Sequence, residues 1–264
     1  MLALILSGLG QLYAGEPRRA LAVYLGSVAL LLGALFSVLP KTFPGLIVFV
    51  LAELSYRLWS MWDSARIARR KQDYVLAPFN RWYWYLAAVL VMNFLIGPRF
   101  DALSPLDTVK VASRSMEPAV LQGDHLCTDV TFYRSSRPSR GDLVLFVSPE
   151  DPKTQLLKRV IGLPGERIEI RDKVIYVDGR RLEDPWGHHG NQSKPGALSF
   201  PDLRNLNDLA AVEIPGDRVF LIGDDRDNSY DSRFYGPVPI SSLRGRPLYV
   251  YWSPDRSRIG ASLR

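Results

Sequence analysis

Residues 156–170 read LLKRVIGLPGERIEI, and this stretch shows the pattern that decides the fold of the second part of the chain. Two short runs rich in Leu, Val and Ile flank a Gly-Leu-Pro-Gly turn, which is typical of β-strands joined by a tight connection. Similar runs follow one another, each bounded by Gly, Pro or Asp: DTVKVAS, GDLVLFV, KVIYVDG, DRVFLIGD and PLYVYWS. We therefore expect residues 101–264 to form a mostly β domain of antiparallel, barrel-like sheets.

Two local features refine this domain. The Asp178-Gly179 pair stands between one strand-like run and a short continuation, which predicts a β-hairpin. Further on, Gly, Pro, Asn, Gln and Ser accumulate, so residues 180–212 are predicted to be a loop-rich surface excursion.

The first hundred residues differ in composition. Residues 20–39 contain no charged side chain, and a helix of that length crosses the ~30 Å hydrocarbon core of a bilayer. Residues 43–62 are also largely apolar, and residues 82–98 begin with four aromatics of the kind enriched at the headgroup level. Residues 1–100 are thus predicted to be a helical membrane region with about three transmembrane helices.

The second predicted span contains two charges, Glu53 and Arg57. Their spacing of four places them on one face of a helix, and we interpret them as a structural ion pair near a helix end. Residues 1–13 are too short to span a bilayer. They lack a basic start and an Ala-x-Ala site, so we do not expect a removed leader; we expect them to lie at the interface or to be the remnant of a longer start.

The distribution of charge separates the two parts. Residues 1–98 hold nine Lys/Arg and four Asp/Glu, a net of +5, while residues 99–264 hold 24 and 23, a net of +1. A nearly neutral polar domain argues against a nucleic-acid partner. Basic residues precede the first span and follow the second. Because such residues favour the cytoplasmic side, the polar domain is predicted to lie on the other side of the membrane.

The stretch VKVASRSMEPAVLQGD, residues 109–124, contains a pair of hydroxyls beside an apolar strip. An extended strand would place four residues of one parity on the same face: Val109, Val111, Ser113 and Ser115. Pro118 would end the strand just after the second serine. This pattern fits a nucleophile at a strand end, and equally an ordinary transition from strand to turn.

Lys158 is the second candidate for chemistry, because it lies inside the strand-like run LLKRVIGL. Most lysines in strands point to water. A lysine packed among Leu and Val is desolvated, which lowers its pKa and allows the neutral amine to accept a proton from a serine hydroxyl.

The third stretch is GDDRDNSYDSRFYGPV, residues 223–238. Its alternating Asp and Asn suggest a calcium loop, but counting from Asp225 the sixth residue is Tyr230 and the twelfth is Gly236, where a calcium loop needs Gly and Glu. We therefore expect a turn-rich loop with ion pairs and no metal. Elsewhere, Cys127 is interpreted as a small buried apolar residue, and the three histidines are expected at the surface: His125, His188 and His189.

Four stretches occur in a fixed order between residues 107 and 239: SRSMEP, GDLVLF, EDPKTQLLKRVIGLPGE and GDDRDNSYDSRFYG. Together they resemble the conserved boxes of the bacterial type I signal peptidases, the leader peptidases of the S26 family. The agreement of four separate stretches in order makes the resemblance specific. The chain departs from the family at Ala119-Val120, Asp225 and Tyr235, none of which is a catalytic position.

The resemblance implies a Ser/Lys dyad in which Ser115 is the nucleophile and Lys158 the general base. It implies that Ser113 joins the Ser115 backbone N–H in an oxyanion hole and that Ser229 orients the lysine. Structural support is expected from four charged residues: Arg159, Asp227, Asp231 and Arg233. The substrate pocket is expected to include Val109, Val111, Met116, Val120 and Leu157.

The family also implies a function. A membrane-bound serine endopeptidase of this kind removes N-terminal signal peptides from exported preproteins, with no cofactor or metal. Its partners would be preprotein signal peptides and the lipid bilayer. It would be a multi-pass protein of the bacterial cytoplasmic membrane, with the catalytic domain on the extracytoplasmic side. Two alternatives stay open. One is a dedicated processing peptidase for one pilin-like or conjugation substrate, with the same chemistry. The other is an inactive scaffold, which the intact Ser115 and Lys158 disfavour.

Overall fold

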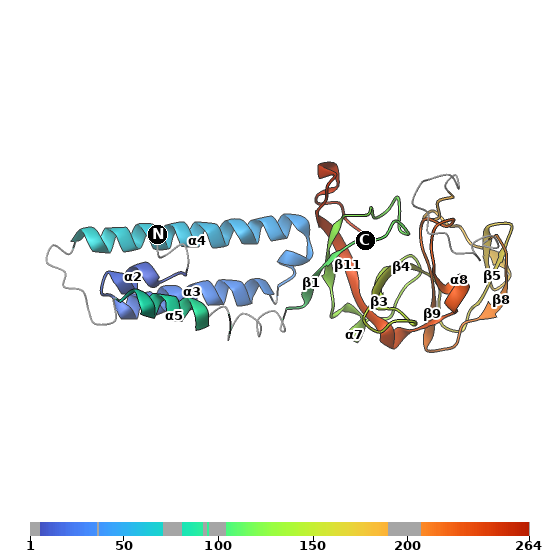
Figure 1. Cartoon of the computed structure of the whole chain (residues 1–264), viewed down its shortest axis with the longest axis horizontal. Coiled ribbons are helices and arrows are strands. Elements are labelled where there is room, and N and C mark those ends of the chain that lie inside the picture. The colour runs from blue at the N-terminus through green and yellow to red at the C-terminus, as the bar shows by residue number, and fades with distance from the viewer. Residues whose placement is uncertain are drawn as a thin grey trace. The chain divides into compact units, whose positions relative to one another are not determined.

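The structure is a computed structural model that describes residues 6–35, 37–70, 81–91, 94, 104–189 and 207–263. The chain divides into two compact units, Met1–Pro105 and Leu106–Arg264. Figure 1 shows the first as a group of helices and the second as a β-rich body.

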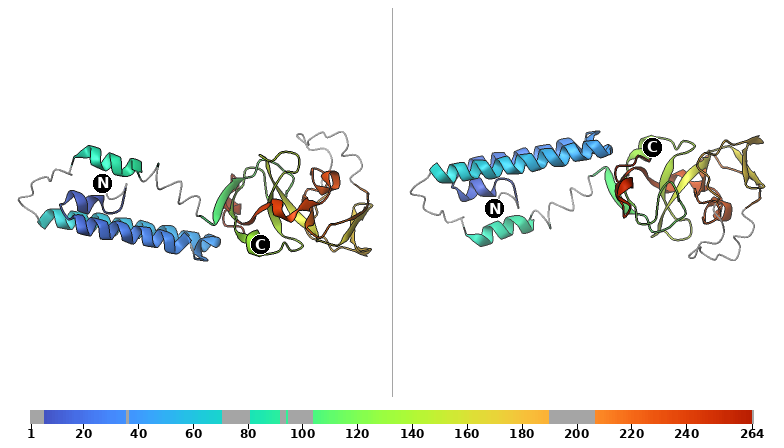
Figure 2. Two further views of the ribbon diagram at one scale, coloured as in Figure 1. Left: turned by 90° about the horizontal axis from the view of Figure 1, so that it is seen from below. Right: turned by 90° about the horizontal axis from the view of Figure 1, so that it is seen from above.

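In its described residues the helical unit contains α2 (Leu9–Tyr13), α3 (Pro17–Leu35), α4 (Phe43–Arg70) and α5 (Trp82–Val91). The short η1 (Leu39–Lys41) joins α3 to α4, so the two long helices form an antiparallel hairpin (Figures 1 and 2). Both are long and apolar enough to cross a membrane, and they coincide with the first two predicted spans. Of the third predicted span, α5 covers ten residues. Most of the rest lies outside the described residues, so that span stays a prediction.

A cluster of polar side chains joins α2 to the long helices. Gln11 Nε2 donates to the Ser60 carbonyl oxygen at 2.9 Å and to Asp63 Oδ2 at 3.1 Å. Arg19 donates to both carboxylate oxygens of Asp63, at 3.0 and 2.5 Å. Gln11 and Asp63 are buried, and polar groups are stable in an apolar interior only when they are hydrogen-bonded. The cluster therefore fixes the place of α2.

Two further contacts define the hairpin. Gly8 precedes α2 with φ +97°, and a Cβ there would overlap the Ala20 carbonyl oxygen, so the close approach of α2 to α3 requires glycine. Within α4, the predicted pair is confirmed: Arg57 Nε lies 3.7 Å from Glu53 Oε2. It lies in the middle of the helix Phe43–Arg70, so its expected place near a helix end is wrong.

Over its described residues, 106–189 and 207–263, the β-rich unit contains two antiparallel sheets. The seven-stranded sheet has the order β1 (Leu106–Lys110), β2 (His125–Asp129), β11 (Leu243–Trp252), β3 (Leu143–Val147), β4 (Gln155–Gly162), β9 (Arg218–Ile222) and β10 (Val238–Pro239). The four-stranded sheet has the order β7 (Arg180–Arg181), β6 (Val174–Val177), β5 (Arg167–Arg171) and β8 (Leu209–Glu213). Within this unit, β5 and β8 lie at the opposite end from β1 (Figure 1). The predicted class, mostly β with an N-terminal helical region, is confirmed.

The long strand β11 curls the larger sheet. Its first residues pair with β3, where Leu243 lies opposite Phe146, and its later residues pair with β2, where Tyr249 lies opposite Cys127. The register shifts within both pairings, and irregularities of this kind bend a strand and increase its twist. The sheet can therefore close over an apolar interior.

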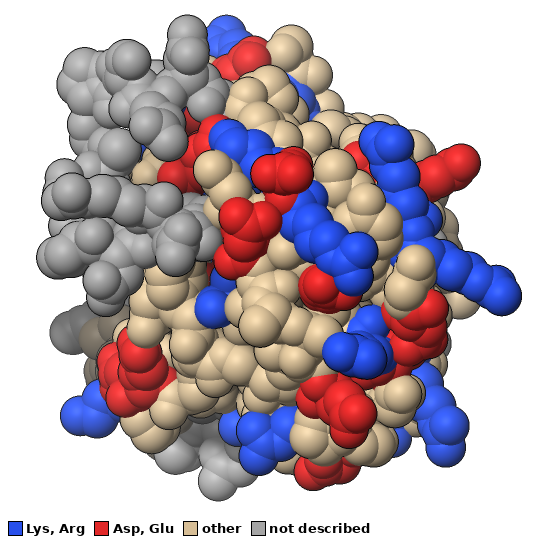
Figure 3. All heavy atoms as spheres, turned by 90° about the vertical axis from the view of Figure 1, so that its right-hand side faces the viewer, with Lys and Arg blue, Asp and Glu red and all other residues tan. Residues whose placement is uncertain are grey.

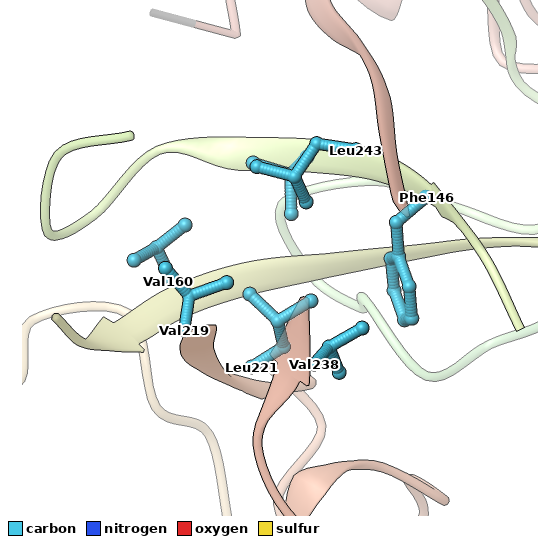
Figure 4. Packing of buried hydrophobic residues seen from close by; sticks show 7 residues of the cluster. Phe146, Val160, Val219, Leu221, Val238 and Leu243 are labelled. Carbon is cyan, nitrogen blue, oxygen red and sulfur yellow. The ribbon is translucent and has the colours of Figure 1, made fainter. Parts of the chain in front are cut away.

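Three apolar clusters fill the unit. One lies between β3, β4, β9 and β10 and includes Phe146, Val160 and Leu221 (Figure 4). A second joins β4 and β9 to the four-stranded sheet, through Ile161 and Phe220 among others. Burying one such side chain contributes roughly 1.5–3 kcal/mol. The third cluster lies beside the candidate site and is described with it.

The structure tests several local predictions. Asp178 and Gly179 have positive φ values and join β6 to β7, which confirms the hairpin. Cys127 is buried, and His188 and His189 are exposed, as expected, whereas His125 is half-buried against Tyr251 and Trp252. On the face shown in Figure 3, basic and acidic side chains of the described residues are intermixed, which agrees with the nearly neutral composition of this domain.

Candidate active site

The candidate site is centred on a contact between two buried polar side chains. Lys158 Nζ donates a hydrogen bond to Ser115 Oγ at 2.5 Å. Lys158 is 3% exposed and Ser115 is 7% exposed. The two residues are 43 positions apart in the sequence, so the fold brings them together.

Strand β4 explains why Lys158 is buried. It lies between β3 and β9, and Lys158 is opposite Val144 of β3, a fully buried residue. Burial lowers the pKa of Lys158 from 10.5 to about 8, with the nearby Asp231 acting in the opposite direction and Arg233 in the same one. Burial disfavours the ammonium form. A substantial fraction of the amine is therefore neutral near physiological pH.

Ser115 lies in a turn rather than in a strand. The strand expected to carry all four residues of one parity ends at Lys110, so Ser113 and Ser115 follow β1 in the irregular segment beyond it. Their hydroxyls nevertheless lie together, with the two Oγ atoms 3.2 Å apart. The turn thus presents two hydroxyls on the same side as Lys158.

Residues 223–233, here called the support loop, contact the backbone of this turn. Asp225 N–H donates to the Ser115 carbonyl oxygen at 3.1 Å. A Cβ on Gly223 would lie 2.5 Å from the same oxygen, so glycine allows the close approach. Gly223 N–H in turn donates to Asp231 Oδ2 at 3.0 Å.

Two buried ion pairs stiffen the support loop. Arg233 Nε and Nη2 contact the two carboxylate oxygens of Asp231, each at 2.8 Å. Arg159 donates to both carboxylate oxygens of Asp224, at 2.8 and 2.5 Å. Burial alone would raise the pKa of Asp231, but Arg233, Lys158 and the Gly223 N–H together outweigh burial and the pKa is lowered. Both carboxylates are fully buried, so each depends on its arginine.

Asp227, an expected support residue, and Ser229, expected to orient Lys158, have surroundings that differ from those of Asp231 and Arg233. Asp227 lies at the edge of the support loop, where Lys173 Nζ contacts its Oδ1 at 3.1 Å and His189 Nδ1 contacts it at 3.3 Å. Ser229 is buried beneath Gly223, and its hydroxyl has no hydrogen-bond partner among the described residues. Its expected role in orienting Lys158 stays a prediction.

The expected substrate pocket is largely one cluster. Val111, Met116 and Val120 are buried together, and Leu157 packs against them half-buried. Val109 is half-buried on β1 and is not part of this cluster. Apolar side chains therefore adjoin the two hydroxyls.

Sequence reasoning missed several residues that hold this site. Arg258, in η5 (Arg256–Arg258), pairs with the buried Asp124 at 2.9 Å. Trp186 lies against Arg159, with the guanidinium carbon 5.3 Å from its ring centroid. The sequence signal for both was weak: Arg is mostly a surface residue, and the contact of Trp186 is with a residue far away along the chain.

A serine hydroxyl in contact with a buried amine, within a β-rich fold, fits the class of serine peptidases. Comparison with known proteins agrees. The model of a family described as signal peptidase, peptidase S26, matches residues 81–252. The chain belongs to this family.

Individual relatives are similar over part of this chain. The probable signal peptidase I-2 of Synechocystis sp. is 31% identical over 151 residues, which cover 55% of this chain and 63% of the relative. The signal peptidase I V of Bacillus subtilis is 32% identical over 163 residues, covering 62% of this chain and 94% of the relative. A crystal structure of a signal peptidase I from Enterococcus faecalis, 30% identical, matches 42% of this chain and 97% of that chain with a TM-score of 0.33.

Proposed function

We propose that this protein is a membrane-bound signal peptidase that removes N-terminal signal peptides from exported preproteins through a Ser115/Lys158 dyad. The contact between Lys158 Nζ and Ser115 Oγ is the observation that carries the proposal. Membership of the signal peptidase family supports the substrate class.

In the proposed reaction the neutral amine of Lys158 accepts the proton of Ser115 as Oγ attacks the scissile carbonyl carbon. The O–C bond forms, the peptide C–N bond breaks, and the proton passes from Lys158 to the departing amine. Water then attacks the acyl-enzyme and gives a proton to Lys158. As the ester C–O bond breaks, Lys158 passes this proton to Ser115 Oγ and restores the hydroxyl, and the product acid loses its own proton to solvent and leaves as a carboxylate.

The negative charge on the carbonyl oxygen would be stabilised by the Ser115 backbone N–H and the Ser113 hydroxyl. The 3.2 Å separation of the two Oγ atoms supports this role for Ser113. Loss of one such donor costs roughly 3 kcal/mol of transition-state stabilisation. Small apolar side chains of the substrate would fit beside Val111, Met116 and Leu157.

We place α3 and α4 across the bilayer. The basic residues Arg66, Arg69 and Arg70 at the end of α4 support a cytoplasmic position for that end. A third crossing before residue 104 would then put the β-rich unit on the extracytoplasmic side, where exported preproteins emerge. Protease digestion of sealed, right-side-out vesicles tests this orientation, because only an external β-rich unit is degraded.

The decisive experiment compares Ser115→Ala and Lys158→Ala with two exposed controls, Ser135→Ala and Lys153→Ala. Purified full chains in detergent are incubated with a preprotein, and mass spectrometry identifies the new N-terminus. We expect cleavage by the wild type and both controls, and none by either site variant. Normal cleavage by Ser115→Ala or Lys158→Ala would exclude the dyad. The same assay over many preproteins separates a general peptidase from one dedicated to a single substrate.

A further inference from the structure

Residues 184–189, here called the strap, leave the four-stranded sheet and lie against the support loop. His188 N–H donates to the Asp224 carbonyl oxygen at 2.8 Å, and Arg226 N–H donates to the His188 carbonyl oxygen at 2.9 Å. On its other side, the same stretch of the support loop reaches Ser115 through the Asp225 N–H at 3.1 Å. The peptide groups of residues 224–226 therefore lie between the strap and Ser115.

An ion pair reinforces this backbone contact. Asp184 holds the guanidinium of Arg226 with both oxygens, at 2.7 and 2.9 Å. Arg226 is 3% exposed, and a buried cation that loses its carboxylate strongly destabilises its surroundings. Asp184 also accepts a hydrogen bond from Gly187 N–H at 3.1 Å, which closes the strap into a turn.

Trp186 provides the second attachment. Its ring lies against the guanidinium of Arg159, which holds Asp224 with two hydrogen bonds. The ring also packs against the apolar cluster that includes Ile161 and Phe220. The strap thus covers the Arg159–Asp224 ion pair at the start of the support loop. It also binds Arg226, two positions after Asp224, through Asp184.

We propose that the strap is a positioning element of the active site, in which Asp184 and Trp186 hold the support loop against Ser115 and keep water away from Lys158. This inference rests on the proposed function, because it takes Ser115 and Lys158 as the reacting groups. Neither strap residue touches them directly.

The support loop carries the charged groups that face Lys158: Asp224, Asp225, Asp231 and Arg233. Burial is the main cause of the low pKa of Lys158. If the loop detaches, water reaches the amine and the pKa rises towards its ordinary value. Less neutral amine is then present at a given pH, so kcat falls and the acidic limb of the pH profile moves to higher pH. The pocket residues come from other segments, so KM changes little.

The test uses Asp184→Asn and Trp186→Ala in the full chain, with Asp184→Glu as the variant that keeps the carboxylate. Matched controls are Glu169→Gln and Tyr176→Ala, which remove an exposed ion pair and a cation–π contact with Arg171 in the four-stranded sheet. For each we measure kcat, KM and the pH dependence of kcat/KM on a signal-peptide substrate. Hydrogen exchange of peptides that contain residues 223–233 is followed in parallel.

We expect kcat to fall roughly 10- to 100-fold in the two strap variants, with the acidic limb at higher pH and faster exchange in the support loop. Asp184→Glu should recover most of the activity, and the controls should behave as wild type. An unchanged acidic limb and unchanged exchange, even with lower thermal stability, would overturn the proposal. If the wild type cleaves no signal peptide, the proposed function fails, but hydrogen exchange still tests the strap. Faster exchange of the support loop in the strap variants supports the contact between strap and loop, and unchanged exchange refutes it.

Discussion

Arg258 Nη2 donates a hydrogen bond of 2.7 Å to the carbonyl oxygen of Ala119, although the two residues are 139 positions apart. Its Nε donates to Asp124 Oδ2 at 3.0 Å, and this oxygen also accepts the Leu121 N–H at 2.9 Å. One side chain from the end of the β-rich unit therefore fixes the segment that follows Ser115 and carries Val120 of the apolar pocket.

Replacing Arg258 by Ala should destabilise the β-rich unit, because Asp124 is fully buried and would lose its cation. We expect a loss of roughly 3–5 kcal/mol in the free energy of unfolding, measured by denaturant titration. Arg258→Lys should recover part of it. The control is Arg256→Ala, which removes an exposed arginine two positions away. An effect on Arg256→Ala as large as that on Arg258→Ala would contradict the role of the Asp124 contact.

The proposed base makes the rate depend on pH. Because the pKa of Lys158 is lowered to about 8, its neutral fraction falls as the pH drops below that value. We expect kcat/KM to decrease about tenfold per pH unit on the acidic side and to level off above pH 8–9. A stopped assay of the wild type between pH 5 and 10 measures this profile of kcat/KM, and its apparent pKa is compared with the ordinary value for a free lysine. A profile that stays flat down to pH 6 would exclude Lys158 as the base.

The same pKa affects stability. In the unfolded chain Lys158 has its ordinary pKa of 10.5, and in the folded chain about 8. Between these values the unfolded state binds more protons, so the free energy of unfolding rises as the pH rises through this window. The contribution is fully present above pH 10.5 and is lost as the pH falls through 8. Lys158→Met should remove this part of the slope, which denaturant titrations at pH 7.5 and 9.5 can measure; an unchanged slope would contradict the burial of a titrating amine.

The polar cluster of the helical unit predicts that replacing Arg19 and replacing its neighbour Arg18 will affect stability differently. Arg19→Ala removes two hydrogen bonds to the buried Asp63. Arg18 is exposed as Arg19 is, but it makes no such bond to Asp63 among the described residues. We expect Arg19→Ala to destabilise the helical unit in detergent by about 1–3 kcal/mol and Arg18→Ala to change little. Thermal unfolding followed by far-ultraviolet circular dichroism compares the two variants. An equal loss of thermal stability in the two variants would contradict the role of the polar cluster in holding α2 in place.

Much of the fold could be predicted from local patterns. The strands around Lys158 and the turn at Asp178-Gly179 follow from alternation and turn chemistry, which act between neighbours in the sequence. The strand order could not be predicted, since nothing in β11 itself indicates that it lies between β2 and β3.

The residues of the candidate site also divide into those that local sequence patterns predict and those that they do not. Ser115 and Lys158 were singled out because their surroundings in the sequence match known motifs. Asp184, Trp186 and Arg258 were missed because their contacts are with residues far away along the chain. The alternation argument for Ser113 was also incomplete, because the strand ends at Lys110 and a turn, rather than a continuous strand, brings the two hydroxyls together.

The position of β11 has a consequence for biosynthesis. This strand fills the place between β2, which leads away from the Ser115 segment, and β3, which pairs with the strand of Lys158. While residues 243–258 are still inside the ribosome, the larger sheet lacks β11 and Asp124 lacks its contact with Arg258. Long-range pairings of this kind form late. We therefore expect the candidate site to assemble only after β11 has left the ribosome.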